Sequence, residues 1–233
     1  MSGDPQDAQV TRVVAIRHGE TAWNAETRMQ GQLDTALSGR GRWQAARVAE
    51  ALATEGIEAV IASDLARAFD TAQAIAERLG LEVATDKGLR ERSFGVFEGH
   101  TYAEIDARWP VEAARWRRHE PDFGPGEGET FRDFSSRAVA AAGRIAAAHA
   151  GRSIAIVTHG GVLDCLYRAA SGSALDASRS WELGNAAINR LLYTRRGFTL
   201  VGWNDTAHLE GEMPLDDGSE GSADVAAASA RQG

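Results

Sequence analysis

The chain has 233 residues, of which 43% are hydrophobic and 25% are charged, a composition typical of a globular protein of ordinary size. Its formal net charge of −8 comes mostly from the ends, because eight of the 33 acidic residues lie before Val10 or after Leu209. The stretch between them is nearly neutral, and neither part suggests binding to nucleic acid, which requires a basic face.

The N-terminal residues do not resemble a signal peptide, because they include Asp4 and Asp7 and contain no apolar run. No stretch of the chain approaches the length of apolar sequence needed to span a bilayer. The single cysteine, Cys165, excludes an internal disulfide framework and fits a reducing compartment. We therefore expect a cytoplasmic protein with no membrane partner, in which Cys165 is a small core residue.

Composition divides the chain into three parts. Residues 1–9 are predicted to be a flexible N-terminus, and residues 210–233 are predicted to be a disordered acidic tail with almost nothing to bury. Residues 10–209 contain no internal repeat or low-complexity segment, so they predict one catalytic domain.

Strands and helices alternate in the first half of this domain. The expected bounds are 10–16 (strand), 38–55 (helix), 59–62 (strand), 65–79 (helix) and 81–84 (a weaker strand). Ser38 is the expected N-cap of the first helix, which Gly56 ends, and Gly80 closes the second. Ser63 and Asp64 offer caps for the start of the second helix.

The second half continues the alternation and ends in a hairpin. The expected bounds are a short helix from 101 that stops before Pro110, a loop at 121–129, a helix at 130–149, a strand at 153–157, a helix after 161, and an antiparallel hairpin at 186–193 and 198–203. Thr101 and Glu104 have the spacing of a capping box. The whole pattern predicts an α/β three-layer sandwich, with a mainly parallel sheet between helices on both faces.

Two histidines follow the two strands with the clearest signals. His18 comes directly after the first strand and His159 after the strand at 153–157, and a glycine follows each of them. In open α/β sheets, ligands bind beyond the carboxyl ends of the strands. One such histidine is more often structural, but two in the same topological place, with Arg17 beside one, are hard to explain by packing. This pattern predicts a ligand site at that edge of the sheet, where the glycines let backbone amides approach the ligand closely.

The chain resembles the histidine phosphatase superfamily, in the branch that includes phosphoglycerate mutase. The resemblance rests on an ordered set of segments: Arg17-His18-Gly19-Glu20-Thr21-Ala22-Trp23-Asn24, Arg28-Met29-Gln30-Gly31, Ser63-Asp64-Leu65-Ala66-Arg67-Ala68, Leu89-Arg90-Glu91-Arg92, Gly126-Glu127-Gly128-Glu129 and Thr158-His159-Gly160-Gly161. These segments keep their order within the predicted domain at 10–209, and the family's phosphoglycerate mutase-like fold agrees with the predicted sandwich.

The resemblance implies a role for each residue of the site. His18 is the expected nucleophile, which forms a phosphohistidine. Arg17, Arg67 and His159 are expected to bind the transferring phosphoryl group. Glu91 is the expected proton donor to the leaving oxygen, which later activates water. Judged from the residues alone, Glu91 could instead form an ion pair with one of its arginine neighbours.

Four further residues resemble substrate-binding positions of the family, namely Asn24, Gln30, Gly31 and Gly160. Trp116-Arg117-Arg118 could be a solvated helix face or a clamp for a substrate carboxylate. No metal or other cofactor is implied, because ligand spacing such as His-Glu-x-x-His is missing and two arginines supply the positive charge.

The expected activity is hydrolysis of a phosphomonoester of a small metabolite. The alternative is a 2,3-bisphosphoglycerate-dependent phosphoglycerate mutase. Where this chain has Ser93 and Phe94, the mutases have His and Tyr, and where it has Tyr102 they have a Lys. Those departures favour a phosphatase, whereas Trp116-Arg117-Arg118 resembles a mutase. An inactive module that binds phosphate or protein is the alternative from another class. The hairpin at 186–203 could pair across a homodimer.

Overall fold

A six-stranded sheet, with strand order β3-β2-β4-β1-β5-β6, forms the centre of the molecule. The computed structural model describes residues 9–211. The strands are β1 (Thr11–Arg17), β2 (Ala59–Ala62), β3 (Val83–Thr85), β4 (Ser153–Thr158), β5 (Ile188–Thr194) and β6 (Gly197–Asp205). The first four strands run parallel, whereas β5 is antiparallel to both β1 and β6. The mainly parallel sheet that the sequence predicts is therefore confirmed.

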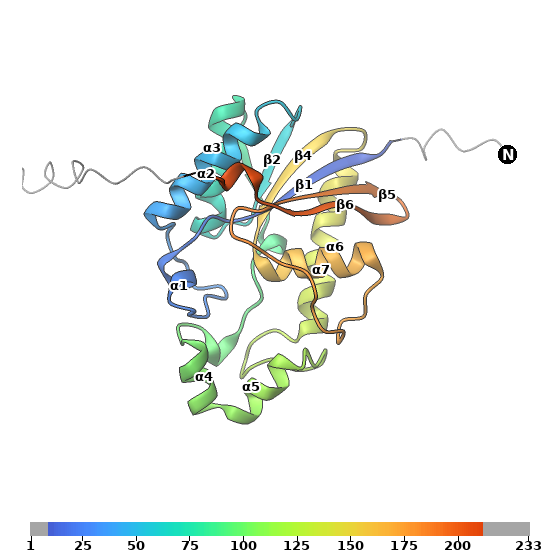
Figure 1. Ribbon diagram of the computed structural model, residues 1–233. Helices are drawn as coiled ribbons and strands as arrows, with labels where there is room; N and C mark the ends of the chain where they lie inside the picture. Colours follow the sequence, from blue (N-terminus) through green and yellow to red (C-terminus); the bar gives the residue numbers. More distant parts are fainter. Residues whose placement is uncertain (1–8, 212–233) are drawn as a thin grey trace, which may run out of the picture.

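Helices cover both faces of this sheet (Figure 1). The four covering helices are α2 (Gly39–Leu52), α3 (Ala66–Leu79), α6 (Phe131–Ala148) and α7 (Gly160–Ser171). Successive side chains of β1 point to opposite faces, so Val14 and Ile16 pack with residues of α2 and α3. Val13 and Ala15 pack instead with residues of α6 and α7. The expected three-layer sandwich is the observed architecture.

A smaller lobe projects from the carboxyl ends of the parallel strands (Figure 1). It contains α4 (Tyr102–Arg108), α5 (Pro110–Arg117) and the short 3-10 turn Gly95–Phe97, with a small core that includes Phe97 and Ile105. We did not predict α5, because we interpreted Pro110 as a stop. Proline is also common at the first position of a helix, because the N–H groups of the first turn have no acceptor within the helix. Pro110 occupies this first position in α5.

Several predicted helix boundaries are also settled. Thr101 and Glu104 form the expected capping box of α4. Gly80 closes α3 in the left-handed conformation, with φ of 67°. Helix α2 ends at Leu52, so Gly56 does not end it as predicted. The one-turn helix α1 (Ala22–Ala25) was not predicted, because four residues carry no periodicity.

The predicted caps of α3 are wrong. Its N-cap is Leu65, which has no side-chain oxygen, and the carboxylate of Asp34 accepts the Ala66 N–H at 2.7 Å instead. Asp64 forms an ion pair with Arg90 at 2.6 Å. The predicted tails at 1–9 and 210–233 lie outside the described residues except for Gln9, Glu210 and Gly211.

No helix within residues 9–211 combines the length and the apolar character needed to cross a membrane.

Candidate active site

The two histidines that follow strands lie side by side. Strands β1 and β4 are neighbours in the sheet, with Arg17 paired to Thr158, so both strands deliver their next residue to the same edge. The imidazole centroids of His18 and His159 are 5.2 Å apart. Arg67 reaches the same place from the first turn of α3, which follows β2. The carboxyl ends of three adjacent strands thus assemble the site.

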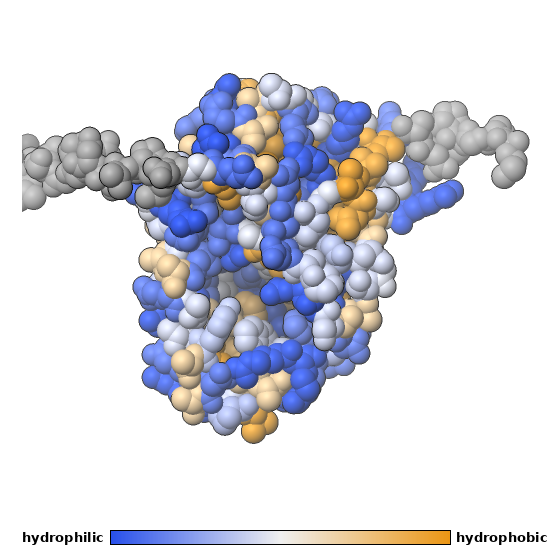
Figure 2. Space-filling view, viewed as in Figure 1, coloured by the Kyte–Doolittle hydropathy of each residue, from blue (hydrophilic) through white to orange (hydrophobic). Residues whose placement is uncertain are grey.

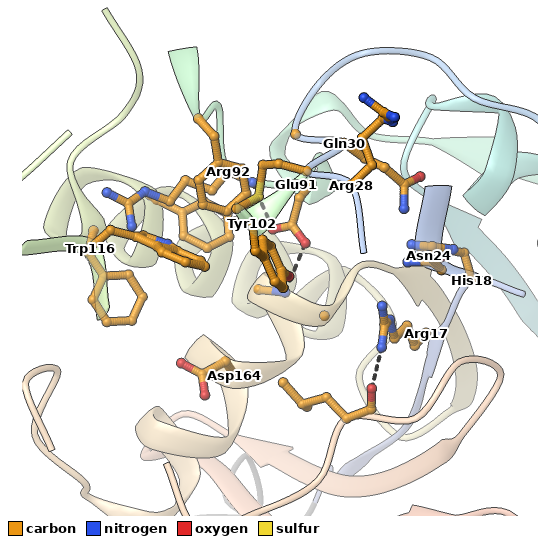
Figure 3. A pocket seen from close by; sticks show the side chains of 18 of the residues that line it. Arg17, His18, Asn24, Arg28, Gln30, Glu91, Arg92, Tyr102, Trp116 and Asp164 are labelled. Atoms are coloured by element: carbon orange, nitrogen blue, oxygen red, sulfur yellow. Dashed lines mark hydrogen bonds between the residues drawn. The ribbon is translucent and has the colours of Figure 1, made fainter. Parts of the chain in front are cut away.

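An open cavity of about 310 Å³ lies between the sheet and the lobe of α4 and α5. Figure 2 shows that this face of the molecule is hollowed between the two parts. Arg17, His18, Arg67 and Glu91 line the cavity, whereas His159 is fully buried beside His18. In the view of Figure 3, Glu91 lies between the His18 side of the cavity and Trp116.

The hydrogen bonds of His18 define which ring nitrogen can attack. His18 Nδ1 lies 2.7 Å from the Gly19 carbonyl oxygen, which can only accept, so Nδ1 carries the proton. His18 Nε2 therefore has the free lone pair. Burial, together with the positive charges of Arg67 and Arg17, lowers the pKa of His18 well below its usual value. His18 is consequently a neutral imidazole, the form that a nucleophile requires.

Three buried side-chain nitrogens around His18 have no partner within the described part of the chain. They are Arg17 Nε, Arg67 Nε and His159 Nδ1. Backbone carbonyls hold other nitrogens of the two guanidinium groups: Arg17 Nη1 donates to Leu183, and Arg67 Nη1 and Nη2 donate to Leu33 and Gly31. A buried group without a partner costs about 1–3 kcal/mol. A phosphate oxygen at this point would satisfy these nitrogens, which makes the arrangement an anion site.

Both arginines keep their charge in this buried setting. Burial lowers the pKa of Arg67 to about 10 and also lowers the pKa of Arg17. A pKa of about 10 still leaves the Arg67 guanidinium protonated near pH 7. The site therefore presents two fixed cations to an incoming anion.

Glu91 is held by backbone groups and forms no ion pair with any residue between 9 and 211. Its Oε1 accepts the Arg92 N–H at 2.8 Å, and its Oε2 accepts the Gly161 N–H at 3.0 Å. A Cβ atom on Gly161 would lie 2.2 Å from Glu91 Oε1, so a larger residue there would displace the carboxylate. Arg90 pairs with Asp64 instead. The carboxyl group is thus fixed at the cavity wall, and the sequence analysis missed Gly161 as its support.

The four predicted substrate-binding residues all line the cavity. Asn24 Oδ1 accepts from the Thr21 N–H and from Asn185 Nδ2, so the Asn24 amide nitrogen is left to donate to other groups. Gln30 Oε1 accepts from the Thr35 hydroxyl at 2.7 Å. The carbonyl of Gly31 accepts a hydrogen bond from Arg67, so Gly31 orients the guanidinium group at the anion site. Gly160 lies beside Arg17, where a Cβ would be 3.5 Å from Arg17 Nε.

The wall opposite His18 is aromatic and partly unexpected. Phe94, Tyr102 and Trp116 line it, and Trp116 contacts both of the other rings. Arg117 and Arg118 do not line the cavity, because they form ion pairs with Asp106 and Glu120 on the exposed surface. The clamp interpretation therefore fails for these two arginines.

Three other cations line the cavity and were not predicted, namely Arg28, Arg92 and Arg179. Arg92 is almost fully buried, and its guanidinium donates to the carbonyls of Glu129 and Phe123. Burial lowers the pKa of Arg92 to about 10. The only sequence signal for Arg92 was its position next to Glu91, where we considered it as an ion-pair partner.

Other potential chemistry is limited in the described residues. No group of three or more His, Cys, Asp or Glu side chains between residues 9 and 211 is arranged to hold a metal ion. Cys165 is fully buried in the core, as expected, and burial raises the pKa of its thiol to about 12.

The buried histidines predict a pH-dependent stability. Burial, with Arg67 next in importance, lowers the pKa of His159 as well as that of His18. Below about pH 6.5 these histidines bind protons in the unfolded chain but stay neutral in the native state. The free energy of unfolding therefore falls as pH falls. Each histidine contributes up to about 1.4 kcal/mol per pH unit, and above that pH the contribution is constant.

Urea unfolding in phosphate-free buffer at about pH 7.5 and about pH 5.5 measures this loss. The double variant His18→Gln, His159→Gln is the control, and its free energy of unfolding should change less between the two pH values. Equal changes in the two proteins would show that the histidines are not held neutral.

The fold and the site together define an α/β enzyme with a cationic, histidine-containing anion pocket. Comparison with known proteins agrees, since residues 13–206 match the family model of the histidine phosphatase superfamily (branch 1). The chain belongs to this superfamily, as the sequence motifs indicated.

Some relatives are named as phosphatases and others as mutases. Phosphoglycerate mutase-like protein 4 of Arabidopsis thaliana is 41% identical over 211 residues, which cover 89% of this chain and 90% of the relative. The mycobacterial glucosyl-3-phosphoglycerate phosphatase, solved with VO3, is 34% identical with a TM-score of 0.76. That match covers 85% of this chain and 100% of the other. Phosphoserine phosphatase of Entamoeba histolytica, solved with 3-phosphoglyceric acid, is 28% identical with a TM-score of 0.77, covering 85% and 99%.

Proposed function

We propose that this chain hydrolyses a phosphomonoester of a small metabolite through a phosphohistidine at His18. The observation that carries the proposal is the set of unpartnered buried nitrogens of Arg17, Arg67 and His159 around a neutral His18. A phosphoryl group fits this set because its oxygens accept hydrogen bonds and its charge matches the two arginines. We further propose that residues 10–209 form the catalytic domain.

In the first step, His18 Nε2 attacks phosphorus in line with the ester oxygen. The new bond joins nitrogen to phosphorus, and the bond from phosphorus to the ester oxygen breaks. Glu91, protonated at the start, gives its proton to the leaving oxygen. Arg17, Arg67 and His159 stabilise the negative charge on the phosphoryl oxygens without moving.

In the second step, water replaces the leaving group. Glu91, now a carboxylate, takes a proton from the water, whose oxygen attacks phosphorus while the bond to His18 breaks. Inorganic phosphate leaves, and both His18 and Glu91 return to their starting forms. The backbone N–H groups that hold Glu91 keep its carboxyl oriented through both steps.

The mutase alternative is supported by the cations Arg28, Arg92 and Arg179, which could hold a second anion, and by the name of the Arabidopsis relative. Against it, Phe94 and Tyr102 stand on the wall where the mutases have a phenol and a lysine. Loss of a charged contact to a buried anion costs about 1.5–3 kcal/mol, or about ten- to a hundredfold in retention. The phosphoenzyme should therefore react with water before a product can reorient.

With 3-phosphoglycerate and catalytic 2,3-bisphosphoglycerate, we expect phosphate release to exceed formation of 2-phosphoglycerate. A panel of phosphosugars and phosphorylated hydroxy acids, followed by phosphate release, identifies the preferred substrate. Tyr102→Lys is the matched variant, since it introduces the lysine of the mutases at a half-exposed position. It should increase the 2-phosphoglycerate fraction by about tenfold. Isomerisation about a hundredfold faster than phosphate release in the unchanged protein would make it a mutase.

A further inference from the structure

Ser63 contacts the active site through one hydrogen bond. It lies in the loop between β2 and α3, and its side chain is fully buried. Its hydroxyl oxygen accepts the Leu65 N–H at 3.3 Å and lies 2.8 Å from His159 Nε2. Ser63 does not line the cavity, so any effect on the reaction must pass through His159.

Hydrogen-bond accounting fixes the direction of the Ser63–His159 bond. A serine hydroxyl has one proton to donate, and its Oγ already accepts from Leu65. If His159 Nε2 were the donor, the buried hydroxyl proton would have no acceptor among the hydrogen bonds of residues 9–211. When Ser63 donates to Nε2, the Leu65 N–H, the Ser63 hydroxyl and His159 Nε2 are all satisfied, and of this group His159 Nδ1 alone remains without a partner among residues 9–211. The ring proton of a neutral His159 is then on Nδ1.

The position of that proton matters for the phosphoryl group. His159 Nδ1 is buried with no partner in the described chain, in a ring 5.2 Å from His18. With the proton on Nδ1, His159 offers a donor to a phosphoryl oxygen. With the proton on Nε2, Nδ1 would present a lone pair, which repels an anionic oxygen.

We propose that Ser63 is a positioning residue that holds His159 in the Nδ1-protonated form, so that His159 donates to the phosphoryl group; the second half rests on the proposed function. His18 has the same tautomer for the opposite reason, because the Gly19 carbonyl accepts from its Nδ1. His18 therefore offers a lone pair to phosphorus, and His159 offers a proton to oxygen. Two fixed tautomers divide the roles of two adjacent histidines.

Long-range ¹H–¹⁵N spectra of the labelled full chain measure this tautomer directly, because protonated and unprotonated ring nitrogens have very different ¹⁵N shifts. The His159→Gln variant identifies the His159 signals by their loss. We expect His159 Nδ1 to be protonated and Nε2 unprotonated, both without ligand and with vanadate. Protonation of Nε2 in the unchanged protein would overturn the proposal, whether or not any variant folds.

Ser63 variants add a kinetic test. Ser63→Ala removes the hydroxyl donor, so His159 can change tautomer, and kcat for p-nitrophenyl phosphate should fall by about a hundredfold, as for one lost oxyanion donor. Ser63→Thr keeps the hydroxyl and should restore both the kcat and the Nδ1-protonated spectrum. A folded Ser63→Ala protein with unchanged kcat and unchanged His159 shifts would overturn the proposal.

The spectra also separate this proposal from the proposed function. A protein that releases phosphate from no substrate, yet shows His159 protonated at Nδ1, would refute the phosphatase assignment and support the tautomer. An active phosphatase with His159 protonated at Nε2 would do the reverse.

Discussion

Replacement of His18 by alanine is expected to lower kcat for phosphomonoesters by about 10⁶-fold, the loss seen when a covalent nucleophile is removed. The reason is chemical, because His18 Nε2 carries the free lone pair of the imidazole in a site where nitrogens of Arg17 and Arg67 are unpartnered. No phosphoenzyme can form without it, and the reaction then depends on direct attack by water. Steady-state phosphate release from p-nitrophenyl phosphate measures the loss.

His149→Asn is the matched control for this variant. His149 follows the end of α6 and bonds the Ile145 carbonyl, away from the cavity. This variant should keep the kcat of the unchanged protein. If the folded His18→Ala protein retained that kcat too, the phosphohistidine mechanism would be wrong.

Replacement of Glu91 by glutamine is expected to depend strongly on the leaving group. An alkyl phosphate needs a proton on its leaving oxygen, so kcat/KM should fall by about 10²–10⁴. p-Nitrophenolate leaves with little protonation, so p-nitrophenyl phosphate should be affected far less. Both Glu91 oxygens accept backbone N–H groups, so the glutamine amide must place its NH2 against one donor. The comparison of two substrates on one variant removes this common positional cost.

Arg67→Ala is the control for the leaving-group effect. Its guanidinium is expected to bind the phosphoryl oxygens, which are the same in every substrate. The kcat should therefore fall by about 10²–10³ for both substrates. A Glu91→Gln variant with equal losses on both substrates would remove Glu91 from the acid role.

Much of the fold could be predicted because the strong signals are local. The buried β4 segment is a continuous apolar run, and the alternation of strands and helices dictates a covered, mainly parallel sheet. Pro110 shows where local rules are ambiguous, since proline both stops one helix and begins the next. Leu65 shows the limit of cap prediction, because the carboxylate that serves α3 comes from Asp34, distant in sequence.

Some residues of the site could likewise be predicted from the sequence, and others could not. His18 and His159 could be placed together from sequence, because adjacent parallel strands deliver residues to one edge. Arg92 could not, and Trp116 was left open between a solvated helix face and a clamp, because the position of both in the cavity depends on how the α4–α5 lobe packs against the sheet. The direction of the Ser63 hydrogen bond also needed the structure, since it follows from a count of donors and acceptors in three dimensions.

The central claim is the covalent bond between His18 and phosphorus, and rapid alkaline quenching tests it most directly. Phosphohistidine survives base, so the enzyme quenched during turnover of p-nitrophenyl phosphate can be digested and its peptides analysed by mass spectrometry. We expect one phosphoryl group on His18, which forms and decays at rates compatible with kcat and is missing from His18→Ala. Turnover with no phosphoryl group on His18, or with the group on another residue, would contradict the mechanism.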